Sequence, residues 1–174
     1  DGGDTTVKTT HELIFTEVLP DGFSGPGDCA ICHSDIGRDI LQTGHWKWSG
    51  TSVNIVGHET ETHGKIDLLN NFCVAVPSNE GRCSQCHISF GWKATSPASF
   101  FDDVDNIDCF VCHDTTGTYR KNPTSGGGGG QQSLMIDGVL TAVEFSDLQD
   151  VVYNVGTPTR ANCGLCHFNA GGGD

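Results

Sequence analysis

The sequence contains four copies of a five-residue pattern made of two cysteines and a histidine. In each copy the cysteines stand three positions apart, and the histidine directly follows the second cysteine. The copies are Cys29-Ala-Ile-Cys32-His33, Cys83-Ser-Gln-Cys86-His87, Cys109-Phe-Val-Cys112-His113 and Cys163-Gly-Leu-Cys166-His167. Two thiols at this spacing can bond to both vinyl groups of one haem, and the adjoining histidine can then ligate its iron. The pattern therefore predicts four covalently attached c-type haems.

Paired cysteines at this spacing also build zinc sites, in which four thiolates surround one metal ion. Zinc would explain the cysteines but not the histidine that follows every pair. The chain has only 8 histidines in 174 residues. A histidine after all four pairs would arise by chance with a probability of roughly one in a few hundred thousand. We therefore prefer haem to zinc or disulfides.

The other four histidines are candidates for the second axial ligand of each iron. They are His11, His45, His58 and His63. A lone histidine usually lies at the surface or in a hydrogen bond, but here four haems with two axial histidines would use every histidine of the chain. Irons with two axial histidines exchange electrons and have no open site for a substrate. We therefore expect an electron carrier and not an enzyme.

The sequence leaves open which distal histidine serves which haem. His45 follows the first motif closely, whereas His58 and His63 are close neighbours in the chain. His11 stands apart near the N-terminus and could reach a haem of its own chain or of a neighbouring subunit.

The composition indicates that haem supplies much of the core. Only 36% of the residues are hydrophobic and 24 are glycine, so few side chains are free to build a conventional core. We expect one tetrahaem domain over residues 1–174. Its fold class is a mostly irregular multihaem cytochrome c, with coil wrapped around stacked haems, a few short helices and a small β-hairpin.

Charge and hydropathy exclude some partners and suggest a location. The formal net charge of -13 argues against binding to nucleic acid or to an anionic membrane surface. No stretch approaches the roughly 20 apolar residues that span a bilayer, so we expect no membrane span.

Because haem-attachment motifs are normally matured outside the cytoplasm, we expect an exported chain at the cell surface or outside the cell, with the periplasm as the alternative.

Local patterns predict a few regular elements. Asp137-Gly138 between the apolar residues of 134–143 is typical of a hairpin turn. Ser146 as N-cap and Gly156 as C-cap bound a predicted helix, and a shorter helix is predicted at 35–42. We interpret residues 11–19 as an extended segment within an N-terminal arm, 1–28, that could contact a neighbouring subunit.

The residues that flank the motifs resemble a known family. They are His45-Trp46-Lys47-Trp48, Asn70-Asn71-Phe72-Cys73, Gly91-Trp92-Lys93, Asp108, Asp114-Thr115-Thr116-Gly117-Thr118-Tyr119 and Pro158-Thr159-Arg160. With them the chain resembles the octahaem tetrathionate reductases and their multihaem relatives. The resemblance implies a catalytic haem with an axial lysine shortly after the glycine stretch, which here is 171–173, and active-site roles for Asn70 and Cys73. The expected lysine and the later haem motifs are absent from this sequence.

The chain also resembles the related tetrahaem extracellular cytochromes that polymerise into conducting filaments. In those filaments a histidine of one subunit completes the coordination of a haem in the next. The resemblance implies a homopolymer in which His11 ligates the neighbour's haem on His167, and which exchanges electrons with other redox proteins or extracellular acceptors. The alternatives are a fragment or relative of a tetrathionate or nitrogen-oxide-type reductase, and a soluble periplasmic electron shuttle.

Overall fold

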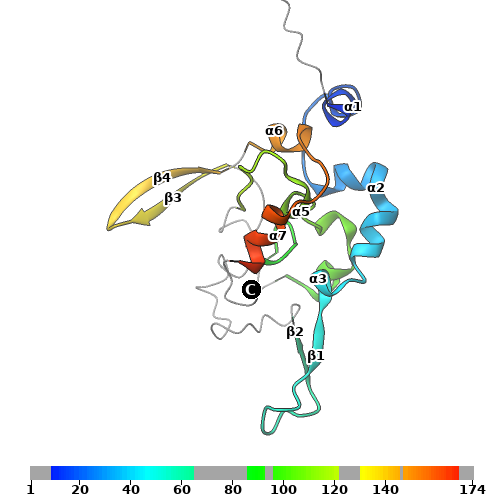
Figure 1. Cartoon of the computed structure of the whole chain (residues 1–174), viewed down its shortest axis with the longest axis vertical. Helices are drawn as coiled ribbons and strands as arrows, with labels where there is room; N and C mark the ends of the chain where they lie inside the picture. Colours follow the sequence, from blue (N-terminus) through cyan, green and yellow to red (C-terminus); the bar gives the residue numbers. More distant parts are fainter. Residues whose placement is uncertain (1–8, 65–85, 93–95, 122–129, 146, 169–174) are drawn as a thin grey trace, which may run out of the picture.

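The structure, a computed structural model, describes residues 9–64, 86–92, 96–121, 130–145 and 147–168. Short helices surround a small centre, and two hairpins project from it (Figure 1). The α-helices are α1 (Thr10–Val18), α2 (Pro26–Ile40), α3 (Gly44–Lys47), α5 (Phe110–His113), α6 (Leu148–Tyr153) and α7 (Arg160–His167), and the 3-10 helices are η3 (Ala98–Asp102) and η4 (Val104–Asn106). The strands are β1 (Ser49–Thr51), β2 (Thr62–Gly64), β3 (Gly130–Ile136) and β4 (Val139–Phe145). The predicted fold class, mostly irregular with short helices and a hairpin, is confirmed.

The buried side chains form one small core that is rich in aromatic residues. Its members are Phe15, Leu41, Trp46, Ile88, Ile107, Phe110, Val111, Tyr119, Val151 and Val152. Trp46 is fully buried, and its Nε1 donates a hydrogen bond to the Phe101 carbonyl at 2.7 Å. This hydrogen bond satisfies the polar end of a large apolar side chain, which fixes α3 against η3.

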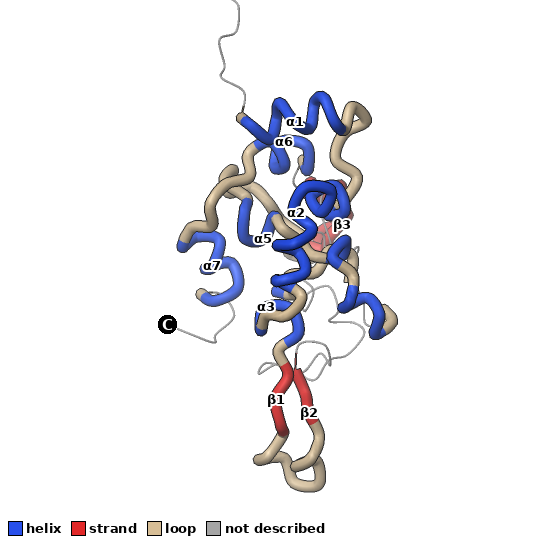
Figure 2. The backbone as a smooth tube through the Cα atoms, turned by 90° about the vertical axis from the view of Figure 1, so that its right-hand side faces the viewer, coloured by secondary structure: helices blue, strands red, loops and turns tan. Residues whose placement is uncertain are grey.

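The segment after His11 is a helix and not the extended segment predicted. The Thr9 hydroxyl accepts a hydrogen bond from the Glu12 amide at 3.1 Å, which caps the first turn of α1. Phe15 is buried, and the Thr9 hydroxyl also donates to the Tyr153 carbonyl at 2.5 Å. Figure 2 shows α1 lying beside α6. From Thr9 onwards, the predicted N-terminal arm therefore packs on its own chain.

Two other helices differ from the prediction in their bounds. The helix predicted at 35–42 corresponds to the second part of α2, which follows a kink at His33 and ends at Ile40. The first part of α2 was not predicted and begins at Pro26, since proline is well suited to the first helical position. The helix predicted to follow Ser146 is confirmed as α6, but it starts one residue later. Its N-cap is Asp147, whose carboxylate accepts from the Gln149 amide at 2.9 Å, and it ends at Tyr153, before Gly156.

The predicted hairpin is confirmed as β3 and β4. Asp137 and Gly138 form its turn with φ of 50° and 81°, as the tight turns that match strand twist require. A second hairpin, β1 and β2, was not predicted. Its strands pair Ser49 with Gly64 and Gly50 with His63, and it extends away from the helices (Figure 2).

No helix in the described ranges is long and apolar enough to cross a membrane.

Candidate functional site

Three of the cysteine motifs lie on helices that present their reactive atoms together. The first motif lies within α2. In the third motif Cys109 directly precedes α5 and the other four residues form it, and the fourth motif forms the last part of α7. On a helix, positions three and four apart share one face, so the two thiols and the imidazole of the fourth motif face the same side. In the first motif His33 lies at a kink in α2, with φ of -114° and ψ of 27°. In the second motif Cys86 and His87 are described, whereas Cys83 lies outside the described residues.

The first and third motifs meet through their leading cysteines. A hydrogen bond from the Cys109 thiol lowers the pKa of the Cys29 thiol, and the same bond raises the pKa of Cys109. Cys29 and Cys109 also line one cavity, so the first and third motifs lie side by side.

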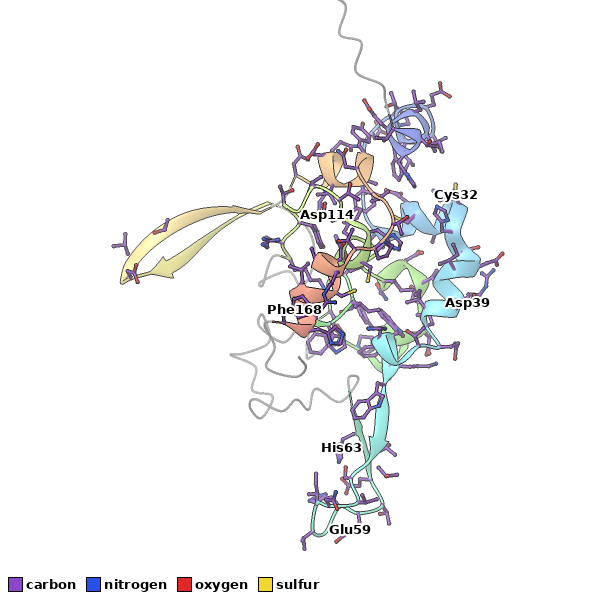
Figure 3. The ribbon with its side chains drawn as sticks, viewed as in Figure 1. Cys32, Asp39, Glu59, His63, Asp114 and Phe168 are labelled. Carbon is purple, nitrogen blue, oxygen red and sulfur yellow. The ribbon has the colours of Figure 1, made fainter. Side chains whose placement is uncertain are left out.

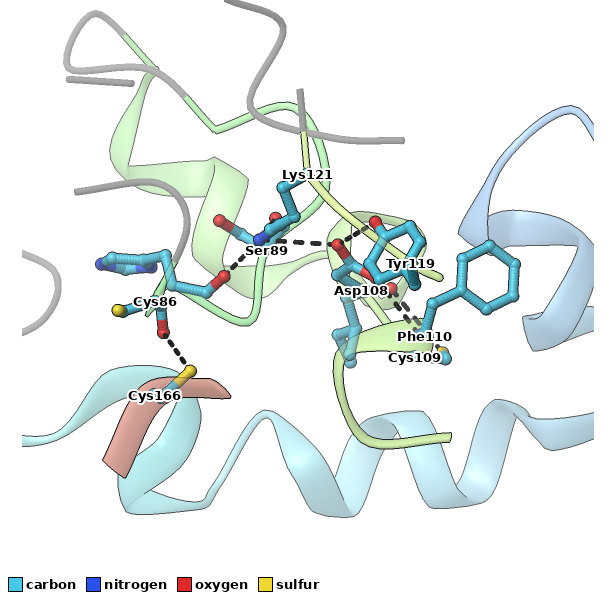
Figure 4. Close-up of polar contacts among 10 residues, drawn as sticks. Cys86, Ser89, Asp108, Cys109, Phe110, Tyr119, Lys121 and Cys166 are labelled. Carbon is cyan, nitrogen blue, oxygen red and sulfur yellow. Dashed lines mark hydrogen bonds and ion pairs between the residues drawn. The ribbon is translucent and has the colours of Figure 1, made fainter. Parts of the chain in front are cut away.

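The fourth motif lies near both the third motif and the second. Burial raises the pKa of the Cys112 thiol, and the charge of Cys163 adds to that rise. At the other end of the fourth motif, a hydrogen bond with Cys86 raises the pKa of the Cys166 thiol, whose Sγ also lies 3.9 Å from the Cys86 carbonyl oxygen (Figure 4). Contacts thus link the first motif to the third, the third to the fourth and the fourth to the second, and the residues after the second motif also bond to the segment before the third.

Two pairs of imidazoles face each other at a common separation. The ring centroids of His11 and His33 are 6.3 Å apart, and those of His45 and His167 are also 6.3 Å apart. An imidazole nitrogen lies about 1.2 Å from its ring centre and about 2 Å from a metal that it binds, so two imidazoles on opposite sides of one metal have centroids about 6.4 Å apart. Both separations are compatible with one metal ion held between the two imidazoles, and both pairs lie within one chain.

A cavity of about 560 Å³ opens between the first and third motifs. Its lining includes both motif histidines, His33 and His113, together with His11. Ile31 and Ile36 of α2 also line it, although their side chains are 63% and 58% exposed. An exposed apolar wall beside metal ligands fits the face of a porphyrin, which would cover it.

Hydrogen bonds between side chains and backbone carbonyls orient the third motif. His113 Nδ1 lies 2.8 Å from the Gly156 carbonyl oxygen. A carbonyl accepts only, so Nδ1 carries the proton and Nε2 remains available to ligate a metal. The Asn162 side-chain amide of α7 donates to the Asp114 carbonyl at 2.8 Å, which joins the third motif to the fourth.

A buried ionic network separates the second and third motifs (Figure 4). Lys121 Nζ lies 3.5 Å from Asp108 Oδ2, and both side chains are almost wholly buried. The Tyr119 hydroxyl donates to the same carboxylate at 2.7 Å. Burial raises the pKa of Asp108 and lowers that of Lys121. Sequence reasoning noted Asp108 only as a flank of the third motif and missed Lys121, because nothing in the chain between them signals the contact.

The remaining two non-motif histidines lie on the projecting hairpin. His58 Nδ1 and His63 Nε2 contact the Glu61 carboxylate at 3.0 and 3.1 Å. The hydrogen bond with His58 is the main cause that lowers the pKa of Glu61. Figure 3 places His63 at the hairpin, far from Cys32 of the first motif and from Asp114, which directly follows the third motif. Asn70 and Cys73, the residues matched to a reductase active site, lie outside the described residues.

Comparison with known proteins finds chains of similar sequence and fold. No protein-family model matches the chain. The solved structure of octahaem cytochrome c from Shewanella oneidensis is similar, with 38% identity and a TM-score of 0.59 over 82% of this chain and 29% of the octahaem chain. A protein of Archaeoglobus fulgidus is 23% identical over an alignment of 203 positions, which covers 94% of this chain and 65% of the archaeal protein. The chain thus spans less than two thirds of either relative.

Motif helices, facing imidazoles and an apolar cavity together define a protein that binds haem covalently. The likeness to the octahaem cytochrome makes the assignment more particular: the chain belongs to the multihaem c-type cytochromes. Proteins of this class transfer electrons.

Proposed function

We propose that the chain carries electrons over a long distance through four haems that follow one another in the order first, third, fourth, second. The observation that supports this most directly is that motifs distant in sequence lie together: Cys29 and Cys109 line one cavity, and Cys166 Sγ lies 3.9 Å from the Cys86 carbonyl oxygen. Thioether-linked haems at these positions would be neighbours, and neighbouring haems exchange electrons.

The protein's own residues set up this transfer. The cysteine pairs hold each haem, and His33, His87, His113 and His167 would be the proximal ligands. His11 and His45 would be distal ligands within the chain, since they face His33 and His167 at 6.3 Å. The haem supplies the redox chemistry, and an iron with two imidazoles favours outer-sphere electron exchange over substrate binding.

We further propose that the chain is the repeating subunit of an extracellular filament. The position of His11 beside His33 favours a ligand to its own chain, so His11 is not the best candidate for a ligand to a neighbour. The hairpin is better placed, because it projects from the body and carries both His58 and His63 (Figures 2 and 3). His87 and His113 are the motif histidines left after the two pairs within the chain are assigned.

The tip of this hairpin also has the character of a docking element. Val53, Ile55 and Val56 have exposed fractions of 62%, 48% and 92%. An apolar tip flanked by two potential metal ligands would be buried by insertion beside a haem of the next copy. A contact of this head-to-tail kind repeats without closing, which produces a filament.

Electron microscopy of the secreted protein and of a His58→Ala/His63→Ala variant tests the proposal. We expect filaments from the native chain and single particles from the variant, with the His11–His33 and His45–His167 pairs intact in both. A matched control is Glu59→Gln, which changes a neighbouring exposed residue without removing an imidazole.

The reductase and shuttle alternatives make different predictions in the same preparation. A native chain that is monomeric with every iron six-coordinate would favour a periplasmic shuttle. A spectrum perturbed by cyanide would reveal an exchangeable iron and favour a reductase, of which this chain resembles one part.

A further inference from the structure

The ammonium group of Lys121 holds the backbone on either side of Ile88 in the second motif region. Lys121 Nζ donates hydrogen bonds to the carbonyl oxygens of His87 and Ser89. Only 3% of the Lys121 side chain and none of the Asp108 side chain is exposed. A buried ammonium needs compensation by charge and hydrogen bonds, and here two carbonyls and one carboxylate provide it.

The same stretch of backbone is fixed on its opposite edge by the segment that precedes the third motif. The Asp108 amide donates to the Ile88 carbonyl at 2.8 Å, and the Phe90 amide donates to the Asn106 carbonyl at 2.7 Å. Successive carbonyls of an extended chain point in opposite directions. The Ile88 carbonyl therefore faces residue 108, while those of His87 and Ser89 face Lys121.

Asp108 connects this arrangement to the third motif. Its Oδ1 accepts from the Phe110 amide at 3.2 Å, at the start of α5. Its Oδ2 meets Lys121 and the Tyr119 hydroxyl. One carboxylate thus caps the helix that carries His113, and its ionic partner anchors the carbonyl of His87.

The imidazole of His87 is also constrained on its face. It stacks on Trp92 with centroids 5.0 Å apart and planes 9° from parallel. Its ring centroid lies 6.0 Å from that of Phe101. With the ring packed on these aromatic groups and the carbonyl held by Lys121, the plane of this imidazole has little freedom to rotate.

We propose that Lys121 is a positioning residue for the second haem: by holding the His87 and Ser89 carbonyls against Asp108, it fixes the orientation of the His87 ligand and the spacing between the second and third sites. This inference rests on the proposed binding of a haem at the second motif. The positive charge of Lys121 favours the reduced form of that haem and the paired Asp108 carboxylate opposes it, so removal of Lys121 alone should disfavour reduction.

The test compares holoprotein of Lys121→Met with the double variant Asp108→Asn/Lys121→Met, in which the loss of both charges avoids an uncompensated buried carboxylate. Haem content is measured by mass, ligand orientation by the low-temperature electron paramagnetic resonance spectrum, and the four potentials by redox titration. Arg38→Met is the control, because it removes an ion pair with Asp35 that is exposed on α2.

We expect both variants to retain four haems and to change the resonance signal of one haem in four. The potential of that haem should fall in Lys121→Met, which loses only a positive charge, and should shift less in the double variant, which loses one charge of each sign. Arg38→Met should leave the resonance signals and the potentials of all four haems unchanged. Four haems with native signals and potentials, combined with a lower melting temperature, would overturn the positioning role and leave only a structural one. Loss of haem from the second motif of the native chain would instead contradict the proposed function.

Discussion

The imidazole of His45 stands at 84° to that of His167, whereas the planes of His11 and His33 differ by 32°. Both pairs have the same centroid separation, so the two proposed iron sites differ in ligand orientation and not in ligand distance. The orientation of the imidazole planes controls the energies of the iron d orbitals that point between the ligands. Axial ligation is one of the means by which a protein sets the electronic properties of a haem iron.

These angles predict two different electron paramagnetic resonance signals. Imidazole planes near 90° make the two π directions at iron nearly equivalent, which increases the anisotropy of the g tensor. We therefore expect a strongly anisotropic low-spin signal from the fourth site and a more rhombic one from the first. The variant His45→Ala should abolish only the strongly anisotropic signal. Loss of the rhombic signal, alone or together with the other, would contradict the pairing of His45 with His167.

Replacing His11 by alanine should open one iron within the chain. Because His11 faces His33 of its own chain, we expect a high-spin ferric signal from one haem per chain, with the same intensity in dilute and concentrated protein. Leu13→Ala is the control, since Leu13 lies in the same helix and is 51% exposed. Disassembly of filaments into chains that keep a six-coordinate first haem would show instead that His11 serves a neighbour.

A methyl group at Gly64 should disrupt the hairpin that carries His58 and His63. An added Cβ would lie 1.9 Å from the Trp48 carbonyl oxygen and 2.6 Å from Ser49 Cα. Both contacts are with backbone, so strand pairing at the hairpin base must break, at a cost on the order of 1–3 kcal/mol. We expect Gly64→Ala to reduce filament length in electron micrographs without altering the signals of the two paired sites, and Thr62→Ala, at an exposed position, to leave the filaments intact. Filaments of native length in Gly64→Ala would argue against the hairpin contact.

The turn of the β3–β4 hairpin provides a test that does not involve haem. Gly138 has φ of 81°, a conformation that costs alanine about 1–2 kcal/mol. We expect amide hydrogens in residues 130–145 to exchange about five to thirty times faster in Gly138→Ala. Gly138→Asn tolerates this conformation better and should change exchange much less. Equal exchange in both variants would mean that the turn does not limit opening of the hairpin.

Sequence patterns predicted the features that depend on neighbouring residues. The Asp137-Gly138 turn was predicted because few residue pairs adopt two positive φ angles, and α6 because Ser146 and Gly156 are typical helix caps. The motif residues were predicted for the same local reason. The Thr9 and Glu12 pair is also a local helix-start signal, and attention to it would have predicted α1 in place of an extended segment.

Features that depend on distant residues were not predictable in this way. No local pattern states that Cys29 meets Cys109 or that Lys121 reaches Asp108, since those contacts follow from how the chain turns between the motifs. The β1–β2 hairpin was missed because its strands have three residues each and include glycine and polar residues instead of an apolar alternation. Its shape depends on the close passage of Gly64 over Trp48.

The order of the motifs in space has a consequence for how the protein is made. A ribosome delivers the N-terminal motifs first, yet the second motif rests on the fourth, through Cys86 and Cys166, some 80 residues later in the chain. Contacts across such sequence distances form late. The second haem would therefore wait in an unfinished environment until the last helix, α7, has folded against it, so a chain interrupted before Arg160 would lack the wall of a site whose own ligands it already contains.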